Sequence, residues 1–319
     1  MLYCFQIHPI TERQGNGTML LSASSFLAAQ YGFEGTMDLY KKAGFTAIDC
    51  GLNGMTNNAD PFCGDGWRER AEEIRRYADK IGLPINQSHA PFSWGNDKWN
   101  DPAYYETVIA PRVLRSIEIA GIFGVKVLVI HPRHQFVYPG HEDEIFEINM
   151  KYYRELIPYA EEAGIRIGVE NMWQTDPRRR HICADTCSKI PDFIRYIDTL
   201  DSDRITACLD IGHTVLVEQQ DEPWDFIRAL GHDRLGALHV HDTDYRSDLH
   251  YLPYMAQIDW NRVTEALGEI DYAGDLTYEC SGPMNYKIMD PEMLGIMLKL
   301  YVDVGNHLIS KIEKSRPKR

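Results

Sequence analysis

Short apolar runs alternate with longer amphipathic segments along most of the chain, and no other sequence feature constrains the fold as strongly. The runs are rich in Val, Ile and Leu, as strands buried on both faces should be, and the segments between them repeat apolar residues at helical spacing. The expected strands are 19–25, 47–52, 85–91, 125–132, 165–172, 205–213, 235–243 and 275–282. Strands that alternate strictly with helices predict parallel pairing and right-handed crossovers, and eight such units predict an α/β fold of the closed (β/α)8 TIM barrel type.

The connections between these elements support the same fold. Helix patterns such as 65–81 and 143–163 lie between the expected strands. Several helices should stop at a glycine shortly before the next strand, because glycine readily adopts the left-handed conformation that ends a helix. These glycines are Gly44, Gly82, Gly124 and Gly164. The long connections instead follow the strands: 53–64, 92–100, 133–141, 173–182, 214–221 and 244–257. Long loops therefore gather at the C-terminal ends of the strands, where barrel enzymes hold their active sites.

The length of 319 residues and the hydrophobic share of 44% fit one large soluble domain. We expect the barrel to occupy residues 19–319 and residues 1–18 to form a flexible extension, so that Met19 could itself be the natural start. The extension has neither the positive start nor the apolar centre of a signal peptide, and no apolar stretch is long enough to span a bilayer. Seven cysteines without a CxxC pair or a disulfide framework favour the reducing cytoplasm.

The charge balance bears on the partners. A formal net charge of −14 disfavours nucleic acid, because a protein that binds a phosphate backbone normally presents a basic surface. One basic run, Arg178–Arg180 followed by His181, interrupts the acidic composition. It is interpreted either as a solvated loop or as a contact for an anion.

Ionisable residues stand at the C-terminal ends of six consecutive expected strands. They are His89, His131, Glu170, Asp210 with His213, His239 with His241, and Glu279. Such groups are costly inside an apolar barrel unless they are paired or bound to metal, and barrel geometry brings them close to one axis. Carboxylates and imidazoles that converge in this way predict a metal site. Three carboxylates and one imidazole suit Mn²⁺, Mg²⁺ or Co²⁺ at least as well as Zn²⁺, because hard oxygen atoms dominate such a ligand set.

The segments GVENMW, CLDIGHT, HVHDTD and TYEC, in this order, resemble strand ends of the xylose-isomerase-like barrel superfamily, and the resemblance covers nearly the whole chain from residue 19. The superfamily includes sugar-phosphate isomerases and epimerases, ketose 3-epimerases, inosose isomerases and dehydratases, and endonuclease IV. The resemblance implies one divalent metal ion, with ligands Glu170, Asp210, His239 and Glu279. His241 is the reserve ligand, because it should share a strand face with His239.

The stretch from His239 to Trp260 resembles the HxxD and IDW segments of the same superfamily. The resemblance places Asp248 and His250 on the loop after the seventh strand, near His213, as further metal-binding or substrate-binding residues. Tyr254 stands where the family often has a glycine, so the local shape of this loop should differ.

The resemblance further implies a metal-dependent isomerase or epimerase that acts on a sugar, a sugar phosphate or a cyclic polyol. Glu170 and Glu279 would exchange protons with the carbon next to a carbonyl group while the metal stabilises the enediolate, and His213 would orient the carbonyl side. Aromatic residues on the loops after strands three and five would form an apolar wall for the substrate: Phe92, Trp94 and Trp173. The expected partner is a small carbohydrate, the expected assembly a homodimer, and membrane binding is not expected.

Three alternatives remain open from the sequence. A phosphodiesterase like endonuclease IV would hold two further zinc ions. Their ligands would be His89, His131 and Glu170 for one ion, and His213, Asp248 and His250 for the other. A dehydratase would act on a related polyol, and a barrel that binds a sugar without turnover would not need both Glu170 and Glu279 as acid/base groups.

Overall fold

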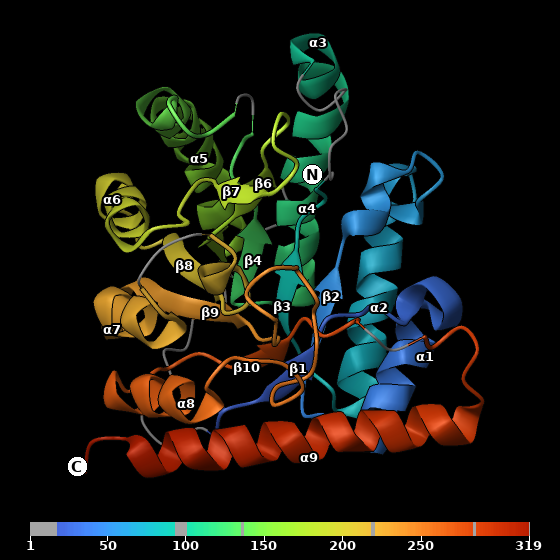
Figure 1. The fold of residues 1–319 in the computed structure, drawn as a ribbon. Coiled ribbons are helices and arrows are strands. Elements are labelled where there is room, and N and C mark those ends of the chain that lie inside the picture. Colours follow the sequence, from blue (N-terminus) through green and yellow to red (C-terminus); the bar gives the residue numbers. More distant parts are fainter. Residues whose placement is uncertain (1–17, 93–100, 135–136, 218–220, 283–284, 319) are drawn as a thin grey trace.

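The computed structural model describes residues 18–92, 101–134, 137–217, 221–282 and 285–318. The eight expected strands are all present, and helices surround them (Figure 1). The strands are β1 Leu21–Ala23, β2 Ile48–Gly51, β3 Ile85–His89, β4 Val127–Ile130, β5 Arg166–Glu170, β8 Ile205–Asp210, β9 Leu235–His239 and β10 Leu276–Tyr278. The expected extension lies almost wholly in residues 1–17, outside the described residues.

The main helices lie between these strands and after the last one. They are α1 Ala28–Ala43, α2 Trp67–Ile81, α4 Ala110–Phe123, α5 Glu142–Ala163, α6 Ile190–Leu200, α7 Pro223–Arg234, α8 Trp260–Glu269 and α9 Pro291–Ser315. Short turns of helix precede or follow some of them: α3 Pro102–Tyr104, a π-helical turn Tyr105–Ile109, and the 3-10 turns Asn53–Thr56, Pro61–Cys63 and His213–Val215. None of the helices in the described part of the chain is long and apolar enough to cross a membrane.

Parallel pairing closes the strands into a ring. Six strands form one parallel sheet in the order β2-β3-β4-β5-β8-β9, and β1 pairs in parallel with β10. Single parallel bridges join the two sheets at Ser24 with Asp49 and at Val240 with Tyr278. The predicted (β/α)8 barrel is therefore confirmed.

The helix ends also agree with the sequence. The four glycines expected to stop α1, α2, α4 and α5 occupy the C-cap positions with φ of 108°, 65°, 71° and 71°. Residues with a Cβ adopt this conformation only at a cost, so glycine lets the chain turn directly into the next strand. The cysteines that the structure describes are all free, and Cys208 and Cys280 are buried, as expected for the apolar strands that carry them.

One long connection differs from expectation. Residues 173–182 were expected to be a loop, but part of this segment forms an antiparallel hairpin of β6 Trp173–Thr175 and β7 Ile182–Ala184. Asp176 holds the turn, because its carboxylate accepts hydrogen bonds from the backbone N–H groups of Arg178 and Arg179. These contacts are local to the turn and leave no apolar periodicity, so the strand pattern used for the barrel could not detect them.

Candidate metal centre

Three groups of potential metal ligands lie side by side at the C-terminal ends of the strands. The central group is Glu170, Asp210, His239 and Glu279; the near group is His89, His131 and Glu170; and the far group is His213, His241, Asp248 and His250. Within each group the potential ligand atoms lie within 4.8 Å of one another. Every strand-end residue singled out in the sequence therefore belongs to one of the three groups.

The central group crowds three carboxylates around one imidazole. His239 Nδ1 lies 2.9 Å from Glu170 Oε1, 3.3 Å from Glu279 Oε2 and 3.9 Å from Asp210 Oδ2. Glu170, Asp210 and His239 are almost fully buried, whereas the side chain of Glu279 is 24% exposed. Negative charges this close inside a protein need a compensating cation, and the mixed oxygen and nitrogen donors fit a divalent metal ion.

The near group shares Glu170 with the central group. His131 Nε2 lies 3.1 Å and His89 Nε2 3.4 Å from Glu170 Oε2, and the two imidazole nitrogens are 3.1 Å apart. The Phe92 ring covers both histidines, with ring centroids 4.8 and 4.5 Å away. Burial lowers the pKa of His131 to about 4, so this ring is neutral near pH 7 and able to act as a ligand.

The far group is an ion-paired network. Asp248 Oδ2 lies 3.1 Å from His250 Nε2 and 3.6 Å from His213 Nε2, and His241 Nε2 lies 2.9 Å from Asp210 Oδ1. Burial tends to lower the pKa of His213, but Asp210 and Asp248 raise it to about 10. Burial acts in the same direction on His250, whose pKa the neighbouring carboxylates raise to about 9. Without an ion, protons therefore balance the charge of this group.

The outer nitrogens of three histidines bind backbone carbonyl groups. Nδ1 of His89, His213 and His250 lies 2.8, 2.9 and 2.6 Å from the carbonyl oxygens of Ala90, Asn171 and Glu279. If each Nδ1–H donates to its carbonyl, the Nε2 lone pair is left to face the carboxylates. This arrangement is typical of histidines that bind metal.

Several buried atoms at the centre lack a hydrogen bond. Glu170 Oε2, His213 Nε2 and Asp248 Oδ1 have no hydrogen-bond partner, although charged groups lie within 4 Å of each. A buried polar atom without a hydrogen-bond partner is costly. These atoms point toward a common space between the side chains instead of forming hydrogen bonds with one another. The residues therefore fit divalent cations.

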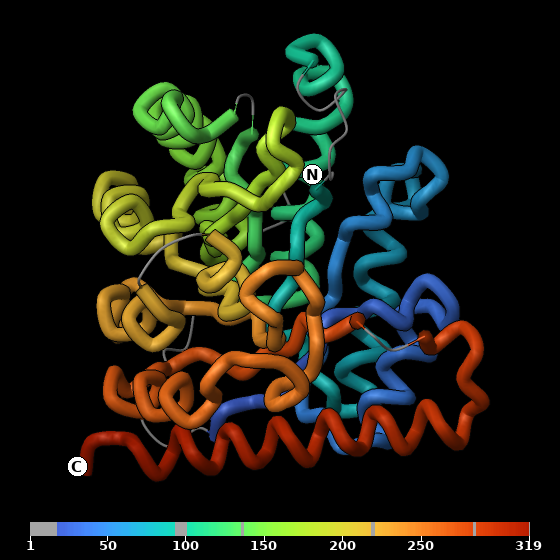
Figure 2. The backbone as a smooth tube through the Cα atoms, viewed as in Figure 1, coloured from blue at the N-terminus to red at the C-terminus, as the bar shows by residue number. Residues whose placement is uncertain are grey.

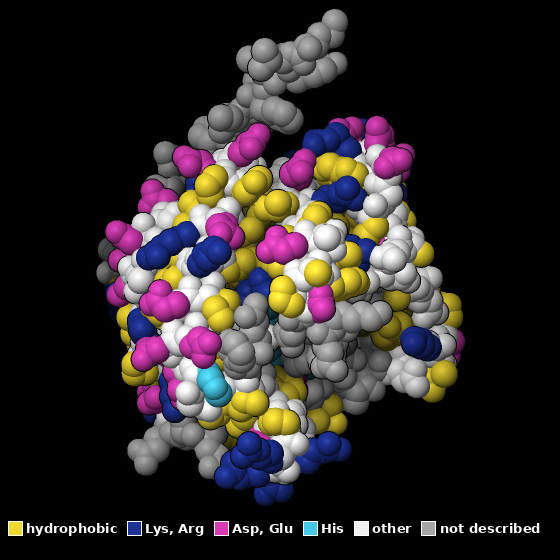
Figure 3. All heavy atoms as spheres, turned by 90° about the horizontal axis from the view of Figure 1, so that it is seen from above, with side chains coloured by type: hydrophobic (Ala, Val, Ile, Leu, Met, Phe, Trp, Pro, Cys, Tyr) yellow, Lys and Arg dark blue, Asp and Glu magenta, His cyan; other side chains and the backbone are white. Residues whose placement is uncertain are grey.

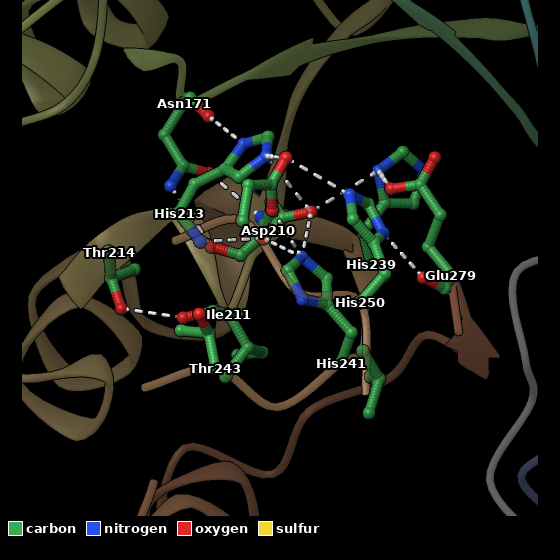
Figure 4. Close-up of polar contacts among 12 residues, drawn as sticks. Asn171, Asp210, Ile211, His213, Thr214, His239, His241, Thr243, His250 and Glu279 are labelled. Carbon is green, nitrogen blue, oxygen red and sulfur yellow. Dashed lines mark hydrogen bonds and ion pairs between the residues drawn. The ribbon is translucent and has the colours of Figure 1, made fainter. Parts of the chain in front are cut away.

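The local sequence at the end of β8 explains the positions of Asp210 and His213. Asp210 ends β8, and its Oδ1 accepts a 2.8 Å hydrogen bond from the backbone N–H of His213 (Figure 4). Gly212 stands between them because a Cβ at that position would overlap the His241 ring. The DIGH segment thus brings a carboxylate and an imidazole into neighbouring groups while leaving room for a third ligand.

Asp242 organises the loop that carries two residues of the far group. Its carboxylate accepts hydrogen bonds from the backbone N–H groups of Thr243, Ala256 and Ile258 and from Trp260 Nε1, at 2.8–3.0 Å. The aspartate of HxxD and the tryptophan of IDW therefore meet and close the intervening chain into a fixed loop. Sequence patterns marked both segments, but not the contact between them.

Asn171 was not among the site residues predicted from the sequence. This buried residue follows Glu170 directly, and its side chain accepts from the backbone N–H of Asp210 and donates to the Asp210 carbonyl at 2.8 and 3.0 Å. Its own carbonyl is the partner of His213 Nδ1 (Figure 4). Asn171 thereby ties the ends of β5 and β8 together, and its place after the expected ligand was the only signal.

Two of the three residues predicted to form an aromatic wall, Phe92 and Trp173, lie in the described part of the chain. Trp173 begins β6, and its ring centroid lies 6.4 Å from that of His213 in an edge-to-face arrangement. Phe92 covers the near group, as given above. Trp94 lies outside the described residues.

Known proteins share this architecture. An uncharacterized protein of Methanocaldococcus jannaschii is 30% identical over 230 residues, which are 71% of this chain and 73% of that protein. The solved structure of 3-keto-D-glucoside 4-epimerase from E. coli is 19% identical, with a TM-score of 0.65 and coverage of 92% of this chain and 100% of that one. D-psicose 3-epimerase of Clostridium cellulolyticum H10, solved with D-tagatose, is 17% identical, with a TM-score of 0.68 and coverage of 91% and 99%. Because the sequence identity to these solved structures is low, their similarity to this chain shows a common fold and nothing further.

The family profile described as xylose isomerase-like TIM barrel matches residues 37–293, a span that includes every residue of the three ligand groups. The chain belongs to the xylose isomerase-like TIM barrel family.

Proposed function

We propose that the protein is a divalent-metal-dependent isomerase or epimerase of a sugar, a sugar phosphate or a cyclic polyol ketone. The observation that carries the proposal is the central group, in which two glutamates from the ends of β5 and β10 meet one aspartate and one histidine within 4.8 Å. The solved neighbours of the same fold include epimerases named for D-psicose and for 3-keto-D-glucoside, which supports a carbohydrate substrate.

A divalent ion held by the central group would supply Lewis acidity next to the substrate carbonyl and so make the neighbouring C–H more acidic. Glu170 and Glu279 would then act as the proton-transferring pair, one removing the proton and the other returning it on the opposite face. Burial would raise the pKa of Glu170, but His239 and His131 hold it well below its usual range, so this carboxylate is charged and suited to bind a cation. Glu279 is the more exposed of the two and can exchange its proton with solvent.

The other residues would bind and orient. His213 donates from a ring fixed by the Asn171 carbonyl, which suits a hydrogen bond to the carbonyl side of the substrate. Trp173 and Phe92 would exclude water from either side of the sugar ring.

Solvent deuterium tests the proposal. The metal-loaded protein is incubated in D₂O with a panel of ketoses, ketose phosphates and cyclic polyol ketones. We expect deuterium at the carbon next to the carbonyl in one class of substrate, together with an epimer or isomer of unchanged mass apart from the label. A dehydratase would instead give a product lighter by one water. If no member of the panel exchanges or is converted, the enzyme proposal fails.

Variants of the two glutamates separate binding from turnover. Glu170→Gln and Glu279→Gln should each lower kcat by about 1,000-fold or more while substrate affinity, measured by calorimetry, changes much less. Unchanged turnover in either variant would remove that residue from the proton-transfer pair.

A second candidate is a three-metal phosphodiesterase. The observation that favours it is the presence of near and far groups beside the central one, each with its own imidazole and carboxylate donors. The net charge of −14 argues against a nucleic-acid substrate. The face seen in Figure 3 mixes acidic, basic and hydrophobic side chains. Metal content by elemental analysis, with hydrolysis of a simple phosphodiester, separates the two candidates: one equivalent without hydrolysis favours the epimerase, and three equivalents with hydrolysis favour the phosphodiesterase.

A further inference from the structure

The C-terminal helix α9 carries apolar residues on two separate faces. One face packs on the barrel and against α1 and α8, and α9 runs along one edge of the molecule (Figure 2). Its buried residues are Leu294, Leu298, Tyr301, Val302, Gly305, Leu308 and Ile312. A helix with one packed face is complete in a monomer, so a second apolar face needs another explanation.

The second face is an exposed stripe. Met293, Ile296 and Leu300 are 45%, 55% and 38% exposed, and Val304, which is half-buried and also packs against the core, continues the stripe one turn further. These positions repeat at three- and four-residue spacing, so they lie along one side of the helix, away from the buried residues. We call these four residues the α9 stripe.

Most of the strongly exposed large apolar side chains that the structure describes lie on α9 or close to it in the chain. The structure describes eight strongly exposed large hydrophobic residues, and six of them lie on α9, just before it, or on the loop that touches it: Tyr254, Met255, Ile288, Met293, Ile296 and Leu300. The Tyr254 ring reaches α9, with its centroid 6.1 Å from that of His307. Concentration of exposed apolar side chains in one patch marks an interaction surface, whereas scattered ones do not.

A hollow adjoins the stripe at its C-terminal half. Tyr254, Asp303, Val304 and His307 line a space of about 450 Å³. Tyr254 has φ of 71°, a left-handed conformation that is costly for a tyrosine, and the ring nevertheless remains 47% exposed on this wall. The face therefore offers both a row of projecting side chains and a space beside them.

We propose that this face binds a second copy of the chain, with the two α9 helices antiparallel and Leu300 at the two-fold axis. Counting outwards from Leu300 in an antiparallel pair, Ile296 of one helix lies opposite Val304 of the other, and Met293 lies opposite His307. The projecting Met293 and Ile296 thus meet the hollow lined by Val304 and His307. A patch that contains both its own projection and its own hollow is what a two-fold interface requires.

The charged residues at the two ends of α9 also favour an antiparallel pair. The first turn of α9 is acidic, with Asp290 and Glu292, and its last turns carry an excess of positive charge, with Lys311 and Lys314 against Glu313. An antiparallel pair places the acidic start of each helix beside the basic end of the other, and the helix dipoles are also opposed. A parallel pair would instead bring like charges together.

The proposed interface reaches the metal centre through one loop. Tyr254 and Met255 lie on the connection that carries Asp248 and His250, between β9 and α8. Holding one end of this connection against a second copy would restrict the loop that delivers part of the far group.

Sedimentation velocity of the full chain over a range of concentrations tests the proposal. We expect wild type to sediment as a species of twice the 36.7 kDa chain mass, and Leu300→Glu to raise the dimer dissociation constant by about 100-fold or more, because two carboxylates would face each other. Tyr159→Glu is the matched control: Tyr159 is 45% exposed on α5, outside the patch, and this variant should remain dimeric.

A mixing experiment tests the position of the axis. Leu300→Glu and Leu300→Lys chains should each be monomeric alone and should form a mixed dimer when combined, since opposite charges then meet at the two-fold. Circular dichroism and thermal melting of each variant establish that it is folded. A monomeric wild type at all concentrations would overturn the proposal and leave the face for a different partner, and a dimer that survives Leu300→Glu would move the interface elsewhere.

Discussion

The near and far groups flank the same central ligands but balance their charge in different ways. In the near group, His131 is neutral near pH 7 because burial lowers its pKa to about 4, and a single carboxylate faces two imidazoles. In the far group, His213 and His250 carry protons at neutral pH because Asp210 and Asp248 raise their pKa values. Within the near group only His131 is a ready ligand, because burial tends to lower the pKa of His89 but Glu170 raises it. The far group is a self-neutralised ion network.

This contrast has a consequence for metal binding. An ion entering the near group displaces no proton from His131, whereas an ion entering the far group must displace protons from His213 and His250. The far group should therefore fill last and only at higher pH. In the proposed function, the far group would donate hydrogen bonds to the substrate while the central group holds an ion.

The largest expected effect is at Glu170, the residue shared by the near and central groups. Glu170→Gln should weaken metal binding by the central group and, at saturating metal, lower kcat of the reaction by about 1,000-fold or more, because it removes a negatively charged ligand and a proton acceptor together. Elemental analysis after dialysis and steady-state kinetics measure the two effects. Full metal content in this variant would contradict the shared role.

Asp248→Asn should affect the far group alone. We expect about 10–100-fold lower kcat/KM, because His213 and His250 lose the carboxylate that orients and charges them, while the central group keeps its metal. As a control, Asp203→Asn removes an exposed carboxylate just before β8, at the opposite end of this strand from Asp210. This variant should leave kcat/KM and the metal content unchanged. Loss of the central metal in Asp248→Asn would show that the groups are not separable.

Gly212→Ala should disturb the far group by steric overlap rather than by charge. The added Cβ would meet the His241 ring, so the free energy of unfolding should fall by about 1–3 kcal/mol. Gly66→Ala is the matched control, since nothing lies within 4 Å of a Cβ at that position. Urea unfolding of both variants measures the effect, and equal stability would mean that His241 moves freely.

The smallest expected effect is the pH dependence of stability in the metal-free chain. The pKa of His213 rises from 6.5 to about 10 on folding, so its stabilisation is complete below pH 6.5 and is lost as the pH rises towards 10. The pKa of His131 falls from 6.5 to about 4, so protons favour the unfolded chain as the pH falls below 6.5. Protonation of His131 therefore lowers the stability of the fold below about pH 6.5, and deprotonation of His213 lowers it above that pH.

Thermal melting with a chelator from pH 5 to 10 checks this expectation. Tm should decline by a few degrees on both sides of a maximum at about pH 6–7. Asp248→Asn should flatten the alkaline decline, because the pKa of His213 is then raised less. A Tm that increases steadily from pH 7 to 10 would contradict the assignment of a charged far group.

The positions of His239 and His241 could not both be predicted from the sequence. Strand alternation predicts that His239 and His241 share a face and compete for one ion. In the structure β9 ends at His239, and the chain then enters the loop fixed by Asp242, so that His241 lies with His213 and His250 instead. Alternation holds only while a strand continues, and the residue at which pairing ends depends on neighbours distant in sequence.

The sequence by itself determined the eight strands, the helices with their glycine ends, and the polar residues at the strand ends, because periodicity and helix termination are local properties. It also indicated that these residues share one end of the barrel, because parallel strands all point the same way. Only the tertiary structure decided how they divide into three groups, how Asn171 and Asp242 hold them, and that a second apolar face of α9 stays exposed. Those outcomes depend on ångström-scale distances between distant segments, which are set by barrel closure and loop contacts rather than by any local pattern.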